Sequence, residues 1–280
     1  MIKDITIGQY FPMNSPIHRL DPRTKLLFAT VYIVMTFVSN NFVGLLFCLI
    51  TACIVIAVSK IPVKTVLKGL RPILLIVIIT SLLQIAYVKT GIVLVNVWRI
   101  KITSGGILMA VFMTVRIALL IVMSTMLTYT TSPTSLTNGL DRIFAPLKKI
   151  GIDFHTVTMI MTIALRFIPT LIEEVDKIMN AQKSRGANFD NGNIIKRAKA
   201  LIPLFIPLLF NSIRRAYELA NAMTCRCYNG GKGKTTMNAL KMKKGDYFAV
   251  IISAAFVAGV ILLNIYCGEY NAEFTFNAAV

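Results

Sequence analysis

The chain alternates between long apolar blocks and short connections that are polar and basic. A helix that spans a bilayer needs about 20 apolar residues. Five blocks reach or approach that length: 26–39, 42–58, 73–88, 107–128 and 247–267. The first two are short and are separated only by Asn40 and Asn41, as in a tilted hairpin. The pattern therefore predicts five membrane crossings in an all-α polytopic membrane protein.

The stretch between the fourth and fifth blocks has a different pattern, and we expect three helices in it. Apolar residues at steps of three and four make the first, at 133–150, amphipathic. The second and third, at 155–184 and about 194–228, are each apolar in one part and charged in another. Gly186 and Gly230-Gly231 supply the stops that end them. The apolar parts are predicted to lie against the bilayer or the membrane bundle, and the polar ends to project into the cytoplasm.

This organisation divides the chain into three parts. Residues 1–131 hold a cytoplasmic segment and four crossings, residues 132–245 hold the three cytoplasmic or interfacial helices, and residues 246–280 hold the last crossing and an external tail. One alternative stays open, because residues 157–172 are apolar enough to enter or span the membrane. A further spanning segment would then be needed to keep the C-terminus outside, so the interfacial placement is preferred.

Composition supports the membrane assignment, and charge sets the orientation. Apolar residues make up 56% of the chain, and the mean hydropathy is +0.70, whereas soluble domains average about 45–50% apolar by a similar count. Between Asp21 and Asp141 there is no acidic residue, and the connections that would lie outside hold only Lys89, Arg99 and Lys101. The positive-inside rule then places the N-terminus in the cytoplasm and the C-terminus outside. Topology thus explains the net charge of +18 without a nucleic-acid partner.

A short phrase that contains one arginine occurs twice in the cytoplasmic part, 41 positions apart. The first copy runs from Asn180 to Gly186 and the second from Asn221 to Cys227, with Asn, Ala, a small residue and Arg in register. The helix dipole favours Arg in any last turn, but it does not explain the Asn-Ala upstream. Because an Arg fork can pair bidentately with a carboxylate, the doubled phrase predicts a docking tip on each of two helices. The two tips are Ser184-Arg185-Gly186 and Cys225-Arg226-Cys227.

The polar run before the first block predicts a helix start and an anchor at the membrane surface. Asp21 suits the N-cap and Pro22 the first helical position. Arg19, Arg23 and Lys25 then suit the cytoplasmic headgroup layer. This anchoring role is preferred over any catalytic use of the neighbouring histidine.

Arg116 lies near the middle of the fourth block, where a charge costs about 2.5–3.5 kcal/mol on insertion scales. None of the first four crossings holds an acid that would pair with it. Two interpretations stay open: a functional or structural contact in the bundle interior, or satisfaction by backbone carbonyls and water.

Two motifs that imitate ligand sites are not interpreted as such, and no cofactor is expected. The run from Gly230 to Thr236 resembles a phosphate-binding loop, but Tyr228 stands where the pattern requires glycine, and a helix precedes it where a strand is needed. Cys225 and Cys227 have no second Cys or His pair nearby, which disfavours a metal site. The chain is therefore predicted to have no nucleotide or metal site and not to be an enzyme.

Over essentially its full length the chain resembles the transmembrane T component of energy-coupling factor (ECF) transporters. The two arginine tips carry the resemblance, together with the run from Ser15 to Lys25, which is similar to the family's opening signature. The resemblance implies long cytoplasmic coupling helices whose tips meet two ATP-binding cassette ATPases. It also implies a membrane-embedded S component, which binds the vitamin or similar micronutrient. The second tip departs from the family pattern, because Cys227 replaces glycine and is not expected to take a left-handed cap as Gly186 can.

Other function classes fit the chain less well. The permease subunit of a conventional ABC importer also docks helices on ATPases, but it normally shows one coupling helix and not two matched tips within one loop. A membrane enzyme of lipid headgroup transfer needs clustered acids for a metal, and the acids here are scattered. The sequence does not disclose the transported substrate, because selectivity belongs to the S component in this arrangement.

Overall fold

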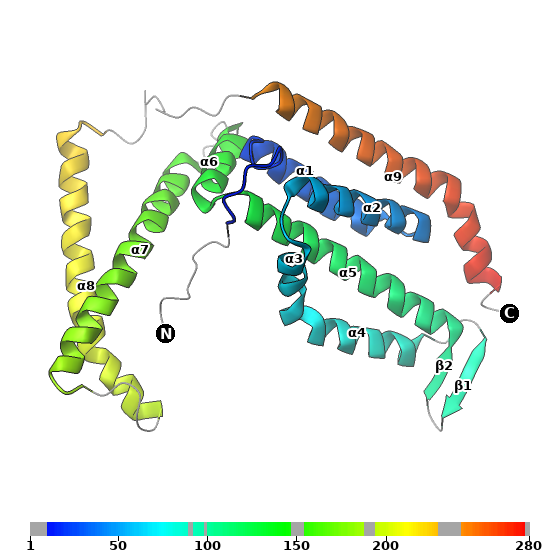
Figure 1. Cartoon of the computed structure of the whole chain (residues 1–280), viewed down its shortest axis with the longest axis horizontal. Coiled ribbons are helices and arrows are strands. Elements are labelled where there is room, and N and C mark those ends of the chain that lie inside the picture. The colour runs from blue at the N-terminus through cyan, green and yellow to red at the C-terminus, as the bar shows by residue number, and fades with distance from the viewer. Residues whose placement is uncertain are drawn as a thin grey trace. The chain divides into compact units, whose positions relative to one another are not determined.

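The computed structural model describes residues 10–88, 92–97, 100–146, 154–187, 194–228 and 242–277. It divides into two compact units, each described by itself (Figure 1). The bundle unit comprises Gly8–Gly139 and Leu240–Val280, and the arm unit comprises Met1–Ile7 and Leu140–Ala239. The helix α6 (Pro133–Phe144) crosses the boundary between them in sequence.

The bundle unit consists of helices and one small hairpin. Its elements are α1 (Pro22–Val38), α2 (Phe42–Ser59), α3 (Val63–Leu70), the short 3-10 turn η1 (Arg71–Ile73), α4 (Leu74–Tyr87), β1 (Val93–Val97), β2 (Ile100–Thr103), α5 (Ser104–Thr130) and α9 (Lys244–Asn277). The helix α5 packs against α1, α2, α3 and α4, and α9 packs against α1 and α2. The helices of the predicted crossings therefore form one bundle around α5.

Aromatic stacking and close helix approach hold the centre of the bundle. Tyr32 is fully buried, donates from its hydroxyl to the Cys48 carbonyl at 2.9 Å and stacks on Phe256 at a ring distance of 5.4 Å. Phe47 also stacks on Phe256, at a ring distance of 5.6 Å. A Cβ at Gly259 would lie 3.2 Å from the Phe47 ring, so glycine lets this ring approach the helix more closely than a larger residue would. Such van der Waals packing at small residues is what drives helix association in lipid.

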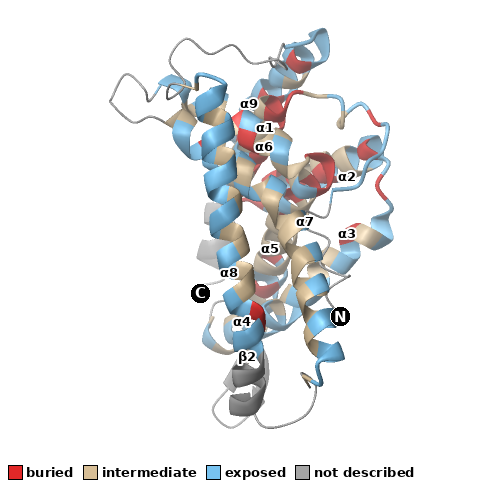
Figure 2. Ribbon diagram, turned by 90° about the vertical axis from the view of Figure 1, so that its left-hand side faces the viewer, coloured by how far each residue is buried: buried red, intermediate tan, exposed pale blue. Residues whose placement is uncertain are grey.

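The arm unit contains the two long helices predicted between the fourth and fifth apolar blocks, α7 (Phe154–Ser184) and α8 (Ile194–Cys225). Both agree closely with the predicted stretches 155–184 and 194–228. The helix α6 starts where predicted, whereas the end of the predicted stretch 133–150 lies outside the described residues. Figure 2 shows α8 as mainly exposed, whereas buried residues gather in α1 and α5.

The observed architecture confirms an all-α polytopic membrane protein. Five described helical segments are long and apolar enough to cross a membrane by length and composition: Phe42–Ser59, Val63–Tyr87, Ser104–Thr130, Phe154–Ser184 and Lys244–Tyr266. With 17 residues α1 is shorter than all of these, and α7 is among them. Length and composition therefore leave both alternatives for residues 157–172 open.

The antiparallel hairpin β1–β2 was not predicted. Its register pairs Val93 with Thr103 and Asn96 with Lys101, with a bulge between Val93 and Val95. Valine, isoleucine and threonine dominate these short strands, and such β-branched residues favour extended backbone. The hydropathy pattern gives no sign of these strands, because the segment between the third and fourth apolar blocks is short and does not span the membrane.

Candidate functional site

The first predicted tip ends α7 in a left-handed cap. Gly186 has φ +88°, and its N–H donates to the Lys183 carbonyl at 2.9 Å. The next N–H, of Ala187, donates to the Gln182 carbonyl at 3.0 Å. This pair of bonds is the Schellman motif, which satisfies carbonyls that a helix end leaves without partners. Arg185 is thus the last residue before the chain turns away.

The second tip ends α8 in the same way, which corrects the expectation for Cys227. Cys227 has φ +56°, in the left-handed region, and its N–H donates to the Thr224 carbonyl at 2.9 Å. The N–H of Tyr228 donates to the Met223 carbonyl at 3.0 Å. The prediction that cysteine would not take this cap was therefore wrong. The two backbone bonds offset the strain that a side chain adds in this conformation.

The two tips thus present their arginines identically. Arg185 and Arg226 hold the same position in the same cap, and both are exposed, as are Ser184 and Cys225 before them. Among the described residues no hydrogen bond or ion pair engages either guanidinium. An exposed Arg fork on a rigidly ended helix is suited to bind a carboxylate on another protein.

The helices α7 and α8 pack in antiparallel fashion, so the two tips lie at opposite ends of the pair (Figure 1). Near the start of α7, Met159 Sδ accepts a hydrogen bond from the hydroxyl of Tyr228, which follows α8, at 2.9 Å. Midway along both helices, Glu174 contacts Arg215, with 3.0 Å between Oε2 and Nη2. These contacts place Arg185 and Arg226 at opposite ends of the helix pair.

A cluster of polar side chains that joins α6 to α7 was not predicted from the sequence. Asp141 in α6 accepts a hydrogen bond from Thr158 Oγ1 at 2.8 Å, and its Oδ1 lies 3.2 Å from Nδ1 of His155. Asp141 thus lies beside the first turn of α7, where the helix dipole stabilises a negatively charged carboxylate. Sequence separation hid this cluster, since its members lie on both sides of residues 147–153.

The predicted anchor residues form a helix start that agrees with the sequence analysis in its backbone and differs in Lys25. Asp21 caps α1 by accepting from the Arg23 N–H at 3.0 Å, and Pro22 is the first helical residue. Arg19 is exposed, and Arg23 also lies 3.8 Å from the Asp21 carboxylate. Lys25, however, is only 8% exposed, and its ammonium donates to the carbonyls of His18 at 3.1 Å and Thr130 at 2.9 Å. It holds protein segments together and does not reach outward for headgroups.

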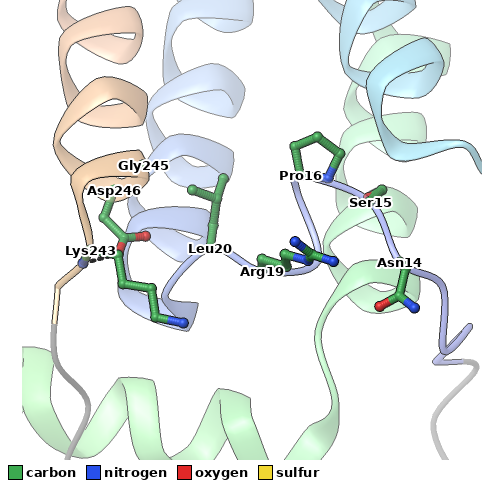
Figure 3. A pocket seen from close by; sticks show the side chains of 8 residues that line it. All are labelled: Asn14, Ser15, Pro16, Arg19, Leu20, Lys243, Gly245 and Asp246. Carbon is green, nitrogen blue, oxygen red and sulfur yellow. Dashed lines mark hydrogen bonds between the residues drawn. The ribbon is translucent and has the colours of Figure 1, made fainter.

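Asp246 joins this helix start to α9 and was not singled out by the sequence analysis. It is 1% exposed, and its carboxylate accepts from the N–H groups of Asp21 and Lys243, both at 2.7 Å, and from Thr24 Oγ1 at 3.2 Å. The carboxylate lies beside an open pocket of about 420 Å³ (Figure 3). The pocket is lined by Asn14, Ser15, Pro16, Arg19, Leu20, Lys243, Gly245 and Asp246.

Arg116 finds its partners inside the bundle. Its Nη2 donates to the carbonyl of Ser39, the C-cap of α1, and its guanidinium lies 4.6 Å from the centre of the Phe112 ring. A cation at the carbonyl end of a helix is favourable, and so is a cation above an aromatic face. These contacts support satisfaction by a backbone carbonyl, and a further functional contact of Arg116 stays a prediction.

Of the two motifs that imitate ligand sites, only Cys225 with Cys227 lies among the described residues. Within the described part of the chain no group of three or more His, Cys, Asp and Glu residues is arranged to hold a metal. Cys225 and Cys227 are exposed and free. The run from Gly230 to Thr236 lies outside the described residues.

Comparison of the sequence with known protein families identifies the family of this chain. The family model of CbiQ, described as a cobalt transport protein, matches residues 13–237, a range that includes both arginine tips and the N-terminal run. The chain belongs to the CbiQ family. The resemblance drawn from the two motifs and the N-terminal run is thereby confirmed.

Relatives of this CbiQ-family chain carry a more specific name. A protein of Ruminiclostridium cellulolyticum is 47% identical over 263 residues, which are 94% of this chain and 98% of the relative. One of Clostridium kluyveri is 46% identical over 270 residues, covering 96% and 100%, and one of Listeria innocua is 39% identical over 261 residues, covering 93% and 98%. Each is named an energy-coupling factor transporter transmembrane protein, EcfT.

Replacing Cys227 with glycine is expected to stabilise the second tip of this CbiQ-family chain. The left-handed conformation costs an ordinary residue about 1–2 kcal/mol, and glycine avoids that cost. Amide exchange at residues 227 and 228 should slow about fivefold, since about 1 kcal/mol corresponds to that factor. Gly186→Ala should have the opposite effect at residues 186 and 187, through the backbone alone, because nothing lies within 4 Å of a Cβ there. Hydrogen exchange followed by mass spectrometry measures both, and faster exchange in C227G would contradict the strain at Cys227.

The burial of Lys25 predicts a pH dependence of stability. Desolvation lowers the pKa of Lys25 from 10.5 to about 8, while the charges of Asp246 and Asp21 oppose the shift. Between pH 8 and 10.5 the unfolded chain then binds more protons at this position than the folded chain, so stability rises with pH in that window. Thermal unfolding of wild type and Lys25→Met between pH 7.5 and 9.5 tests this. The wild type should gain stability relative to the variant, and parallel curves would refute the assignment.

Proposed function

We propose that this chain is the transmembrane energy-coupling subunit of an ATP-driven ECF importer for a vitamin or similar micronutrient. Its partners are two ATP-binding cassette ATPases in the cytoplasm and a membrane-embedded S component that binds the substrate. The observation that carries the proposal is the pair of identically capped, exposed arginines at opposite ends of α7 and α8. The name of the relatives, an energy-coupling factor transporter transmembrane protein, supports it.

In the proposed mechanism the chain transmits motion and performs no chemistry. ATP-driven closure of the two ATPases moves the tips that bear Arg185 and Arg226. The helices α7 and α8 carry that motion because each is continuous for more than 30 residues. Exposed apolar side chains such as Ile160, Phe205 and Phe210 then offer contact surface to lipid or to the S component. ATP hydrolysis belongs to the ATPases, so the chain needs no nucleotide site of its own.

Two tips favour this assignment over the permease subunit of a conventional ABC importer. Such a permease normally presents one coupling helix to its ATPase. Here a single chain presents two arginines in the same cap, one at each end of a helix pair. One chain is thus equipped to meet two ATPases at once.

The direct test of docking is co-purification. The two ATPases are co-expressed with the tagged chain, and the ATPases retained and the ATP-dependent uptake of substrate are compared between wild type and the double variant R185A/R226A. Unchanged values in both assays would refute the docking role.

The proposed orientation places both tips in the cytoplasm, and Cys225 provides a native label for it. A variant that keeps Cys225 as its one cysteine is expected to react with a membrane-impermeant maleimide in inside-out vesicles and not in intact cells. The physical reason is the excess of Lys and Arg in the segments predicted to lie inside. As a control, a cysteine introduced at Ile92, an exposed position before β1, should show the reverse pattern. Labelling of Cys225 from outside the cell would overturn the orientation.

A further inference from the structure

A carboxylate in the middle of α7 is held by two residues of α8. The Glu174 side chain is only 12% exposed. Its Oε1 accepts from Asn211 Nδ2 at 2.5 Å, and its Oε2 lies 3.0 Å from Nη2 of Arg215. A buried carboxylate is costly unless it is paired and hydrogen-bonded. One neighbouring helix supplies both: Asn211 donates a hydrogen bond to Oε1, and Arg215 brings the opposite charge beside Oε2, so Glu174 is tied to α8.

The neighbouring charges show that this arrangement is specific. Glu173, the residue before Glu174, is exposed. Arg214, the residue before Arg215, is 74% exposed and lies 3.9 Å from Glu218 of its own helix. Two acids adjacent on α7 thus face different surroundings, as do two arginines adjacent on α8. Among these four charges, the ion pair that joins α7 to α8 is the one between Glu174 and Arg215.

The contact stands at the same distance from both arginine tips. Glu174 precedes Arg185 by 11 residues, and Arg215 precedes Arg226 by 11 residues. The separation of Glu174 and Arg215 is therefore 41 positions, the same as the offset of the repeated phrase. At 1.5 Å per residue each arm measures about 16 Å, and the antiparallel packing places the two tips about 30 Å apart. The ion pair thus marks the centre of a local, approximate two-fold relation between the two arms.

We propose that Glu174, bound by Asn211 and Arg215, is a positioning residue that fixes where α7 and α8 cross and so sets the spacing of the two arginine tips. The inference rests on the proposed function, because the spacing matters if the tips dock on two ATPases at once. Two arms of equal length fit a pair of ATPases that present equivalent acidic sockets around an approximate two-fold axis. Sliding one helix along the other by one helical turn would change the distance between the two tips by about 5 Å. One of the two arginines would then miss its socket.

The spacing is measured directly on the purified full-length chain in nanodiscs. Spin labels are attached to cysteines introduced at Lys183 and Thr224, exposed positions two residues before each arginine, in a background without the native cysteines. Pulsed dipolar spectroscopy should give one narrow distance distribution, centred at about 30 Å. Glu174→Gln, which keeps the shape and removes the charge, should broaden or shift it. Glu173→Gln, which removes the same charge next door at an exposed position, should leave it unchanged.

A charge exchange separates positioning from a general loss of folding. The variant E174R/R215E restores an ion pair between α7 and α8 and should recover the narrow distribution, whereas E174R alone should not. ATP-dependent uptake should fall several-fold in E174Q and recover in the exchanged pair. The proposal is overturned if E174Q keeps the wild-type distribution, or if E173Q broadens it to the same extent.

These outcomes are distinguishable from failure of the proposed function, since the distance measurement uses no ATPase. An unchanged distribution in E174Q, combined with loss of the ATPases in R185A/R226A, refutes the positioning role and leaves docking intact. A broadened distribution, combined with retained ATPases in R185A/R226A, supports the crossing and refutes docking through the arginines.

Discussion

Replacing Arg185 and Arg226 together with alanine is expected to abolish co-purification of the two ATPases and ATP-dependent uptake. Each arginine is the exposed end of a rigidly capped helix, and losing one partner of a hydrogen-bonded charge pair that is buried in an interface costs about 2–5 kcal/mol. A single variant should therefore weaken assembly by about 30- to 4,000-fold at the affected tip, because 1.4 kcal/mol is a factor of ten. The other tip still tethers the complex, and such double attachment raises the effective concentration of the second contact. The double variant loses both contacts.

The conservative exchange and a matched control sharpen this expectation. Arg185→Lys with Arg226→Lys keeps both charges and removes the bidentate fork, so retention of the ATPases should lie between wild type and the double alanine variant. Arg214→Ala removes an equal charge from α8 at a position 74% exposed and 12 residues before the second tip. It should leave assembly unchanged. Equal losses in R214A and R226A would attribute the effect to the net charge of α8 and contradict a docking role of the tip.

The features that the sequence predicted well are those with a local cause. Asp21 and Pro22 start α1, and Gly186 ends α7, because capping depends on a few neighbouring residues. The long apolar blocks were predicted as helices from another local property, their length and apolar composition. Cys227 shows where local reasoning failed, since residue preference alone disfavours φ +56°. The preference was outweighed by the same two backbone hydrogen bonds that cap α7.

The features that the sequence missed depend on contacts between distant residues. Asp246 lies 225 positions from Asp21, and Glu174 lies 41 from Arg215. No periodicity or motif in one segment reveals that another segment supplies its donors. A different signal was available in hindsight for α7 and α8. The repeated phrase has the same offset as the Glu174–Arg215 pair, so repeat alignment places two acids on α7 opposite two arginines on α8.

Replacing Asp246 with alanine is expected to destabilise the bundle unit more than any surface change. Its carboxylate accepts from two backbone N–H groups and from Thr24, and its charge lies close enough to Lys25 to raise the pKa of that buried ammonium. Alanine leaves these donors without an acceptor and leaves the Lys25 charge less compensated. A buried donor left without an acceptor costs about 1–3 kcal/mol, and three donors lose their acceptor here, so the free energy of unfolding should fall by about 3 kcal/mol.

Thermal unfolding of the purified chain in one detergent measures the effect of Asp246→Ala. The matched control is Glu218→Ala, which removes a carboxylate that is 69% exposed and pairs only at the surface with Arg214, a contact worth about 0.3–0.5 kcal/mol. Asp246→Asn should lie between the two, because an amide oxygen can still accept from Asp21, whereas the amide NH₂ faces the N–H of Lys243.

With Asp246 absent, the pKa of Lys25 should fall further below about 8, since Asp246 is the first of the charges that raise it. In the D246A variant the rise of stability with pH should therefore begin at a lower pH than in the wild type and persist above pH 8, because the folded chain releases the Lys25 proton earlier. If D246A and E218A unfold at the same temperature, the attachment of the N-terminal run to α9 does not depend on this carboxylate.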